Sequence, residues 1–143
     1  ISPEAQSLID AGKESFGEGL KMARSGNRIG DISAAVQACV EGHGYGVVRS
    51  LCGHGIGKEM HEDPQVPNFG KAGHGPRLRE GMCIAVEPMI TAGDYRVYIA
   101  ADDWAFLTRD HSIAAHYENT LAITADGDPL ILTMPNGFDG EDV

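Results

Sequence analysis

The first 45 residues carry hydrophobic and small side chains at helical spacing, separated by polar positions. One stripe predicts a helix that starts after Ser2, has Pro3 in its first turn and stops at Ser25-Gly26. A second stripe predicts a helix that starts near Asp31 and stops in a glycine-rich segment. We expect both stripes to face the core; their members are Leu8, Ala11, Ser15, Phe16, Gly19, Leu20 and Ala23, then Ile32, Ala35, Val36, Cys39 and Val40.

After these helices the pattern changes to short alternating segments and turns. Residues 52–57 are rich in glycine and predict a loop, and Pro64 and Pro67 predict an irregular stretch after it. Strands are predicted over residues 82–87, 95–99, 104–108, 116–123 and 130–133. Two helices followed by an antiparallel sheet indicate an α+β fold over residues 1–134, and residues 135–143 predict an acidic, flexible tail.

Charge and cysteine content narrow the classes of function. The net charge of −10 over 143 residues argues against nucleic acid as the main ligand and against an anionic membrane surface. No segment approaches the ~20 apolar residues of a membrane span. Three scattered cysteines favour a reducing compartment, so we expect a cytoplasmic protein. Because the chain begins at Ile1 rather than Met, we expect a processed or trimmed chain or a piece of a longer one.

A carboxylate at the end of the strand predicted over residues 82–87 is a first candidate for chemistry. Alternation puts Met82, Ile84 and Val86 on one face, and it leaves Glu87 on a face of small residues, directly before Pro88. Taken alone, this pattern favours a solvent-facing glutamate. The predicted strand 116–123 shifts that balance, because Glu118 shares a face with His116, Thr120 and Ala122. Two carboxylates in one cleft repel each other and favour a bound cation.

A histidine between glycines supplies a third possible ligand. Seen alone, His54 in the segment 53–57 is as compatible with a buried, hydrogen-bonded histidine as with a metal ligand. A phosphate loop is a weak interpretation because the run has no Lys-Ser/Thr ending. One imidazole and two carboxylates suit Mn²⁺, Fe²⁺, Co²⁺ or Zn²⁺ and leave positions open for water. His61 would then either support a metal ligand from behind or face the substrate.

Four motifs in this order and spacing resemble those of type I methionine aminopeptidases: Cys52-Gly53-His54-Gly55-Ile56-Gly57, His61-Glu62-Asp63-Pro64, Glu87-Pro88-Met89 and His116-Tyr117-Glu118-Asn119-Thr120. The resemblance implies that His54, Glu87 and Glu118 bind metal, with Glu118 bridging two divalent ions (Co, Mn, Fe or Zn). It implies that Glu87 also accepts a proton and that His61 is catalytic and contacts the scissile peptide. Trp104 and Met60 would line the substrate site, with Met60 standing where the family is expected to carry Phe.

The same resemblance implies a fold, an activity and a partner. The fold would be the C-terminal half of a pita-bread fold, with two helices packed on a curved antiparallel sheet. The activity would be removal of the N-terminal methionine from nascent proteins and peptides by metal-activated water. The family's two aspartate ligands have no counterpart here, since the aspartates before His54 are Asp10 and Asp31, both in predicted helices. We therefore expect the 143-residue chain alone to bind metal weakly and to need an upstream half, in cis or in trans, for activity.

Three alternatives stay open at the level of the sequence. A proline-specific pita-bread aminopeptidase would use the same kind of ligands, although residues 61–67 look like the methionine type. A non-catalytic pita-bread module would bind peptides without a stoichiometric metal. The half-fold could also pair with itself or with a separately encoded partner.

Overall fold

The first helix begins where the sequence predicts and ends slightly earlier, at Met22 rather than at Ser25-Gly26. The computed structural model describes residues 1–125 and 127–134, so the predicted tail, 135–143, lies outside the described residues. Helix α1 spans Pro3–Met22, and the Ser2 hydroxyl accepts a hydrogen bond from the Ala5 N–H at 3.1 Å. The whole predicted stripe is buried, from Leu8 to Ala23.

Helix α2, Ile29–Gly42, packs beside α1 with a face slightly different from the predicted one. Ile32, Val36 and Val40 are buried as predicted, but Ala35 and Cys39 are only half-buried. Buried Gly30 and Ser33 take part instead, because segment 70–75 packs against this side of the helix: a Cβ at Gly30 would overlap the backbone oxygens of Lys71 and His74. The helix is therefore turned toward that segment.

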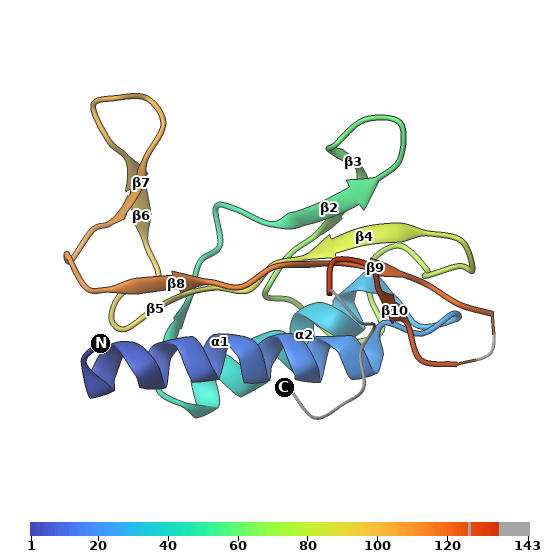
Figure 1. Ribbon diagram of the computed structural model, residues 1–143, viewed down its shortest axis with the longest axis horizontal. Coiled ribbons are helices and arrows are strands. Elements are labelled where there is room, and N and C mark those ends of the chain that lie inside the picture. The colour runs from blue at the N-terminus through green and yellow to red at the C-terminus, as the bar shows by residue number, and fades with distance from the viewer. Residues whose placement is uncertain (126, 135–143) are drawn as a thin grey trace.

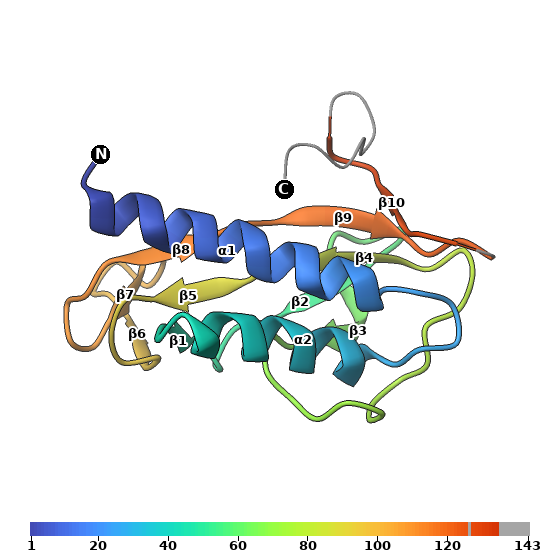
Figure 2. The ribbon, with the colours of Figure 1, turned by 90° about the horizontal axis from the view of Figure 1, so that it is seen from below.

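The strands of the described residues form three antiparallel sheets, and Figure 1 shows how they are arranged. The five-stranded sheet has the order β10-β9-β4-β2-β3, the three-stranded sheet β1-β5-β8, and β6-β7 is a separate hairpin. Both helices lie side by side on one face of the sheets (Figure 2), and the β6-β7 hairpin stands on the opposite side (Figure 1). The strand bounds are β1 Gly46–Val47, β2 Gly53–Ile56, β3 Glu62–Val66, β4 Cys83–Val86, β5 Met89–Thr91, β6 Val97–Ile99, β7 Phe106–Thr108, β8 Ala114–His116, β9 Asn119–Ala122 and β10 Leu130–Ile131.

Two segments predicted as a loop and an irregular stretch are strands. Residues 52–57 contain β2, and the proline-containing segment forms β3 around a cis Asp63-Pro64 bond. The glycines that suggested a loop instead let β2 lie close between two neighbours. A Cβ at Gly53 would overlap the backbone oxygen of Ala85 on β4, and one at Gly55 would overlap that of Asp63 on β3. The pairing of β2 with β3 shifts register between His54 and Gly55.

The predicted continuous strand over residues 116–123 is also wrong. It divides into β8, which pairs with β5, and β9, which pairs with β4. Val86 pairs with Asn119 and Met89 with His116, so the ladder is interrupted at the same point on both sides. Pro88 has no N–H to donate to the ladder, whereas its carbonyl still accepts from the Tyr117 N–H at 3.1 Å. We call the interrupted residues, Glu87–Pro88 and Tyr117–Glu118, the strand junction.

In the part of the chain that the structure describes, no helix has both the length and the apolar character needed to cross a membrane.

Asp31 ties the start of α2 to segment 70–75, and its replacement by alanine is expected to reduce stability. Its carboxylate accepts from the backbone N–H groups of Arg28 and Gly73, each at 2.7 Å, and these bonds hold the Asp31 pKa below its ordinary value of 3.8. We expect Asp31→Ala to lower the free energy of unfolding by about 1–2 kcal/mol at neutral pH, as for loss of a helix cap.

The effect of Asp31→Ala should depend on pH in one direction. A carboxylate with a depressed pKa stabilises the fold above its unfolded-state pKa and loses that contribution as the pH falls through the folded-state pKa. Urea unfolding at neutral pH and below pH 3.8 should therefore show a difference that shrinks in acid. Glu80→Ala, at an exposed position, is the control. An equal difference at both pH values would contradict this role of the ionised carboxylate.

Candidate metal centre

The strand junction places two glutamates beside a histidine of the neighbouring strand. Glu87 follows β4, Glu118 precedes β9, and His54 lies on β2, which pairs with β4. One ligand atom from each of His54, Glu87 and Glu118 lies within 4.8 Å of the other two. The three side chains that the sequence predicted as metal ligands thus lie together. The pairing of β2 with β4 brings His54 near Glu87, and the strand junction brings Glu87 near Glu118.

His54 is oriented by the backbone carbonyl of the next residue, Gly55. Its Nδ1 lies 2.9 Å from the Gly55 carbonyl oxygen, and because a carbonyl can only accept, Nδ1 carries the proton. The Nε2 lone pair is then free, and this atom lies 3.7 Å from Glu87 Oε1. An imidazole whose second nitrogen is fixed by a carbonyl is the usual arrangement of a metal-binding histidine.

Glu87 is nearly buried and has no strong cationic partner. Its side chain is 11% exposed, and Asn68 donates from Nδ2 to the Glu87 carbonyl oxygen at 2.8 Å, which holds the backbone in place. Among residues 1–125 and 127–134, Glu87 forms no ion pair with a lysine or an arginine; the nitrogen-bearing side chains beside its carboxylate are the imidazoles of His54, at 3.7 Å, and His116, at 3.2 Å. A nearly buried carboxylate beside a second one calls for a bound cation.

His116 belongs to the same cluster, although sequence reasoning assigned it no role. Its Nε2 lies 3.2 Å from Glu87 Oε2 and 3.9 Å from Glu118 Oε2. The hydrogen bond to Glu87 raises the pKa of His116 above its ordinary value. The sequence does indicate that His116 and Glu118 share one face, because they alternate along one segment. It does not indicate that Glu87 lies opposite them, which is set by the pairing of the strands.

A pocket of about 930 Å³ opens beside these ligands. Its polar lining includes His54, His61, Glu87 and His116, and most of the rest is apolar, with Leu51, Met89, Val97, Ile99, Trp104 and Phe106 among its lining residues. The ring of His61 lies 4.2 Å from that of His54 between centroids. Trp104 lines the pocket but is 85% exposed, whereas Met60 is 72% exposed and is not among the lining residues.

The donor set fits a divalent cation. One free imidazole nitrogen and two carboxylates form a borderline-to-hard set, which suits Mn²⁺, Fe²⁺, Co²⁺ or Zn²⁺ better than a thiophilic ion. The nearly buried carboxylate lacks a fixed positive charge, so a cation would relieve the repulsion between Glu87 and Glu118.

Comparison with known proteins identifies the family. The sequence model of Metallopeptidase family M24 matches residues 1–125. The chain belongs to this family. Members of a metallopeptidase family use metal ions, so the divalent cation that the donor set suits is also what the family requires.

Relatives of high identity within this M24 family are methionine aminopeptidases, which confirms the resemblance seen in the motifs. The chain is 56% identical over 134 residues to the methionine aminopeptidase of Clostridium acetobutylicum, a match covering 94% of this chain and 53% of that protein. It is 44% identical over 127 residues to methionine aminopeptidase 1 of Bacillus subtilis, covering 89% and 51%. The chain spans about half the length of the curated relatives it matches.

Solved structures confirm the fold class of this M24 chain. The methionine aminopeptidase of Thermotoga maritima superposes with a TM-score of 0.90 at 42% identity, covering 93% of this chain and 53% of that one. An X-Pro aminopeptidase from the same organism superposes with a TM-score of 0.68 at 21% identity, which shows a shared fold alone. The predicted α+β half of a pita-bread fold is therefore confirmed.

Proposed function

We propose that the protein containing this chain is a metalloaminopeptidase that removes the N-terminal methionine from nascent proteins and peptides. The observation that carries the proposal is the convergence of His54, Glu87 and Glu118 at the strand junction, beside a largely apolar pocket. Relatives also support the proposal, because three proteins named methionine aminopeptidase are 43–56% identical to this chain along most of its length.

His54, Glu87 and Glu118 are the proposed metal ligands, with Glu118 shared between two divalent ions in the complete protein. Such ions, Co, Mn, Fe or Zn, would supply Lewis-acid activation of water and stabilise negative charge at the attacked carbonyl. Because this chain aligns with about half of its relatives, further ligands would come from the upstream half, in cis or in trans.

The side chains around this site have proposed roles of their own. Glu87 would accept the proton of the attacking water, since its carboxylate lines the pocket and is shielded from bulk solvent. His116, hydrogen-bonded to Glu87 Oε2, would orient that carboxylate. His61, which lines the pocket beside His54, would donate a hydrogen bond to the scissile peptide.

The apolar wall would hold the methionine side chain. Trp104 lines the pocket from the β6-β7 side and would close over an unbranched apolar chain. Met60 would contribute only from a more distant position, since it lies outside the pocket lining. The proposal includes a cytoplasmic location, since nascent proteins are the proposed substrates.

The test is substrate choice by the complete gene product that contains this chain. We expect it to release methionine from a Met-Ala-Ser peptide, to leave an Xaa-Pro peptide intact and to carry stoichiometric divalent metal. Cleavage of the Xaa-Pro peptide instead would favour a proline-specific enzyme with the same fold. Binding of both peptides without cleavage, and without bound metal, would favour a peptide-binding module.

A further inference from the structure

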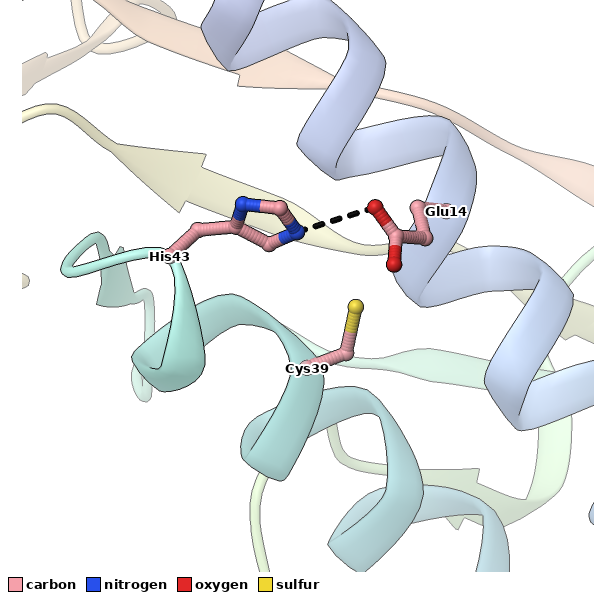
Figure 3. Close-up of side chains that lie close together, drawn as sticks. All are labelled: Glu14, Cys39 and His43. Carbon is pink, nitrogen blue, oxygen red and sulfur yellow. Dashed lines mark hydrogen bonds and ion pairs between the residues drawn. The ribbon is translucent and has the colours of Figure 1, made fainter.

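A second group of metal-binding side chains lies between the two helices. Glu14 projects from α1, and Cys39 and His43 project from the C-terminal end of α2 (Figure 3). One ligand atom from each lies within 4.8 Å of the other two. His43 Nε2 is 2.9 Å from Glu14 Oε2, and in Figure 3 the Cys39 sulfur points into the gap between these two groups.

The helical geometry places these three groups together. Cys39 and His43 are four residues apart, so they occupy one face of α2 a single turn apart. His43 is the C-cap residue, at which the chain leaves the helix, and its ring leans across to α1. The His43–Glu14 ion pair explains two of the three positions, but it does not explain why the Cys39 thiol faces the same gap.

The electrostatic surroundings of Cys39 favour a cation. Burial and then the negative charges of Glu14 and Glu18 raise the pKa of the Cys39 thiol, whereas Lys21 opposes them. Lys21 is itself paired with Glu18 at 2.5 Å and is exposed. A divalent ion in the gap would neutralise Glu14 and stabilise the thiolate, because a metal-bound thiol is deprotonated.

We propose that Glu14, Cys39 and His43 form a Zn²⁺ site that links α1 to α2. Thiolate, imidazole and carboxylate are the ligands that Zn²⁺ takes, and a water molecule would complete a tetrahedron. Bond lengths of about 2.0–2.3 Å put neighbouring ligand atoms of a tetrahedral site about 3.3–3.7 Å apart. Small rotations of the exposed Glu14 and His43 side chains can widen their 2.9 Å contact and bring the three ligand atoms to these separations.

Binding would displace protons in a defined way. The Cys39 thiol would release its proton to solvent and bind as thiolate, and the Nε2 proton of His43 would be exchanged for one on Nδ1. This site is separate from the candidate metal centre, because the helices cover one face of the sheets and the pocket opens beside the hairpin on the other (Figure 1). The two helices would then be held together by coordination as well as by their apolar contacts.

Cobalt absorption tests the proposal without relying on activity. Co²⁺ occupies zinc sites, and its bond to a thiolate gives a near-ultraviolet charge-transfer band. The complete gene product with the candidate metal centre disabled (His54→Ala, Glu118→Gln) would be titrated with Co²⁺. We expect a saturable band at one Co²⁺ per chain that Cys39→Ser abolishes, and at least about tenfold weaker Co²⁺ binding in Glu14→Gln and in His43→Ala.

Matched variants make the outcome decisive. Cys52 lines the pocket and Cys83 lies on β4, so Cys52→Ser and Cys83→Ser should leave the band unchanged. Circular dichroism would show that each variant is folded, which is expected because Glu14 and His43 are exposed and Cys39 is half-buried. Absence of the band at saturating Co²⁺, or its loss in Cys52→Ser rather than in Cys39→Ser, would overturn the proposal. Competition by Zn²⁺ at lower concentration than Co²⁺ would support Zn²⁺ as the ion.

Discussion

Replacing Glu87 with glutamine is expected to lower kcat for methionine release by about 10²–10⁴-fold, the range for loss of a general base. Glutamine keeps the size of the side chain, and its amide oxygen can still accept a hydrogen bond from His116 Nε2. It carries no negative charge, however, and accepts no proton at neutral pH. At a position only 11% exposed, water cannot readily replace the missing carboxylate.

The measurement must separate loss of the base from loss of the metal. Metal content and kcat of Glu87→Gln would be measured in the complete gene product at rising concentrations of Co²⁺ or Mn²⁺. We expect bound metal to recover at high concentration while kcat stays low. Glu80→Gln, at an exposed position outside the pocket, is the control and should behave like the unmodified protein. Full recovery of kcat along with the metal would show that Glu87 acts as a ligand alone.

Replacing Gly53 with alanine is expected to lower the free energy of unfolding by about 1–3 kcal/mol, the range for overpacking a core. The added Cβ would overlap the Ala85 carbonyl oxygen and would lie 3.2 Å from the Val66 Cβ. A backbone oxygen in a sheet cannot move aside as a flexible side chain can, so β2 must separate from β4. Since β2 carries His54 and β4 leads to Glu87, the same shift should weaken metal binding.

Gly42→Ala is the matched control for this substitution. Gly42 ends α2, no atom lies within 4 Å of the position its Cβ would take, and alanine is a better helix former. Urea unfolding should therefore show Gly42→Ala to be neutral or slightly stabilising, and isothermal titration with Co²⁺ should show unchanged affinity. A Gly53→Ala variant as stable as the unmodified protein would mean that β2 and β4 do not pack this closely.

Local sequence patterns predicted that both helices exist and which face of α1 is buried. A serine cap, a proline in the first turn and a stripe of apolar and small residues describe α1 completely, because these features act within one or two turns. The face of α2 was less well predicted. Burial of Gly30 and Ser33 depends on segment 70–75, which lies about forty residues further along the chain and has no helical periodicity.

The strands show the opposite balance. The glycines of 52–57 and the prolines at 64 and 67 have the local properties of loops, yet β2 and β3 form because pairing with β4 and with each other outweighs those preferences. Similarly, residues 116–123 alternate like one strand, and nothing in that segment indicates its break. The interruption comes from Pro88 on the opposing strand, which cannot donate to the ladder.

By itself, the sequence determined which side chains can bind a cation, which helix faces are apolar and which family the motifs resemble. These follow from residue types and short spacings, which folding does not change. Only the tertiary structure decided that Glu87 and Glu118 meet at the strand junction, that His116 joins them, and that Glu14 faces Cys39 and His43. These contacts join segments far apart in the chain, so they depend on strand register and on helix packing. Register and packing are set by the core as a whole.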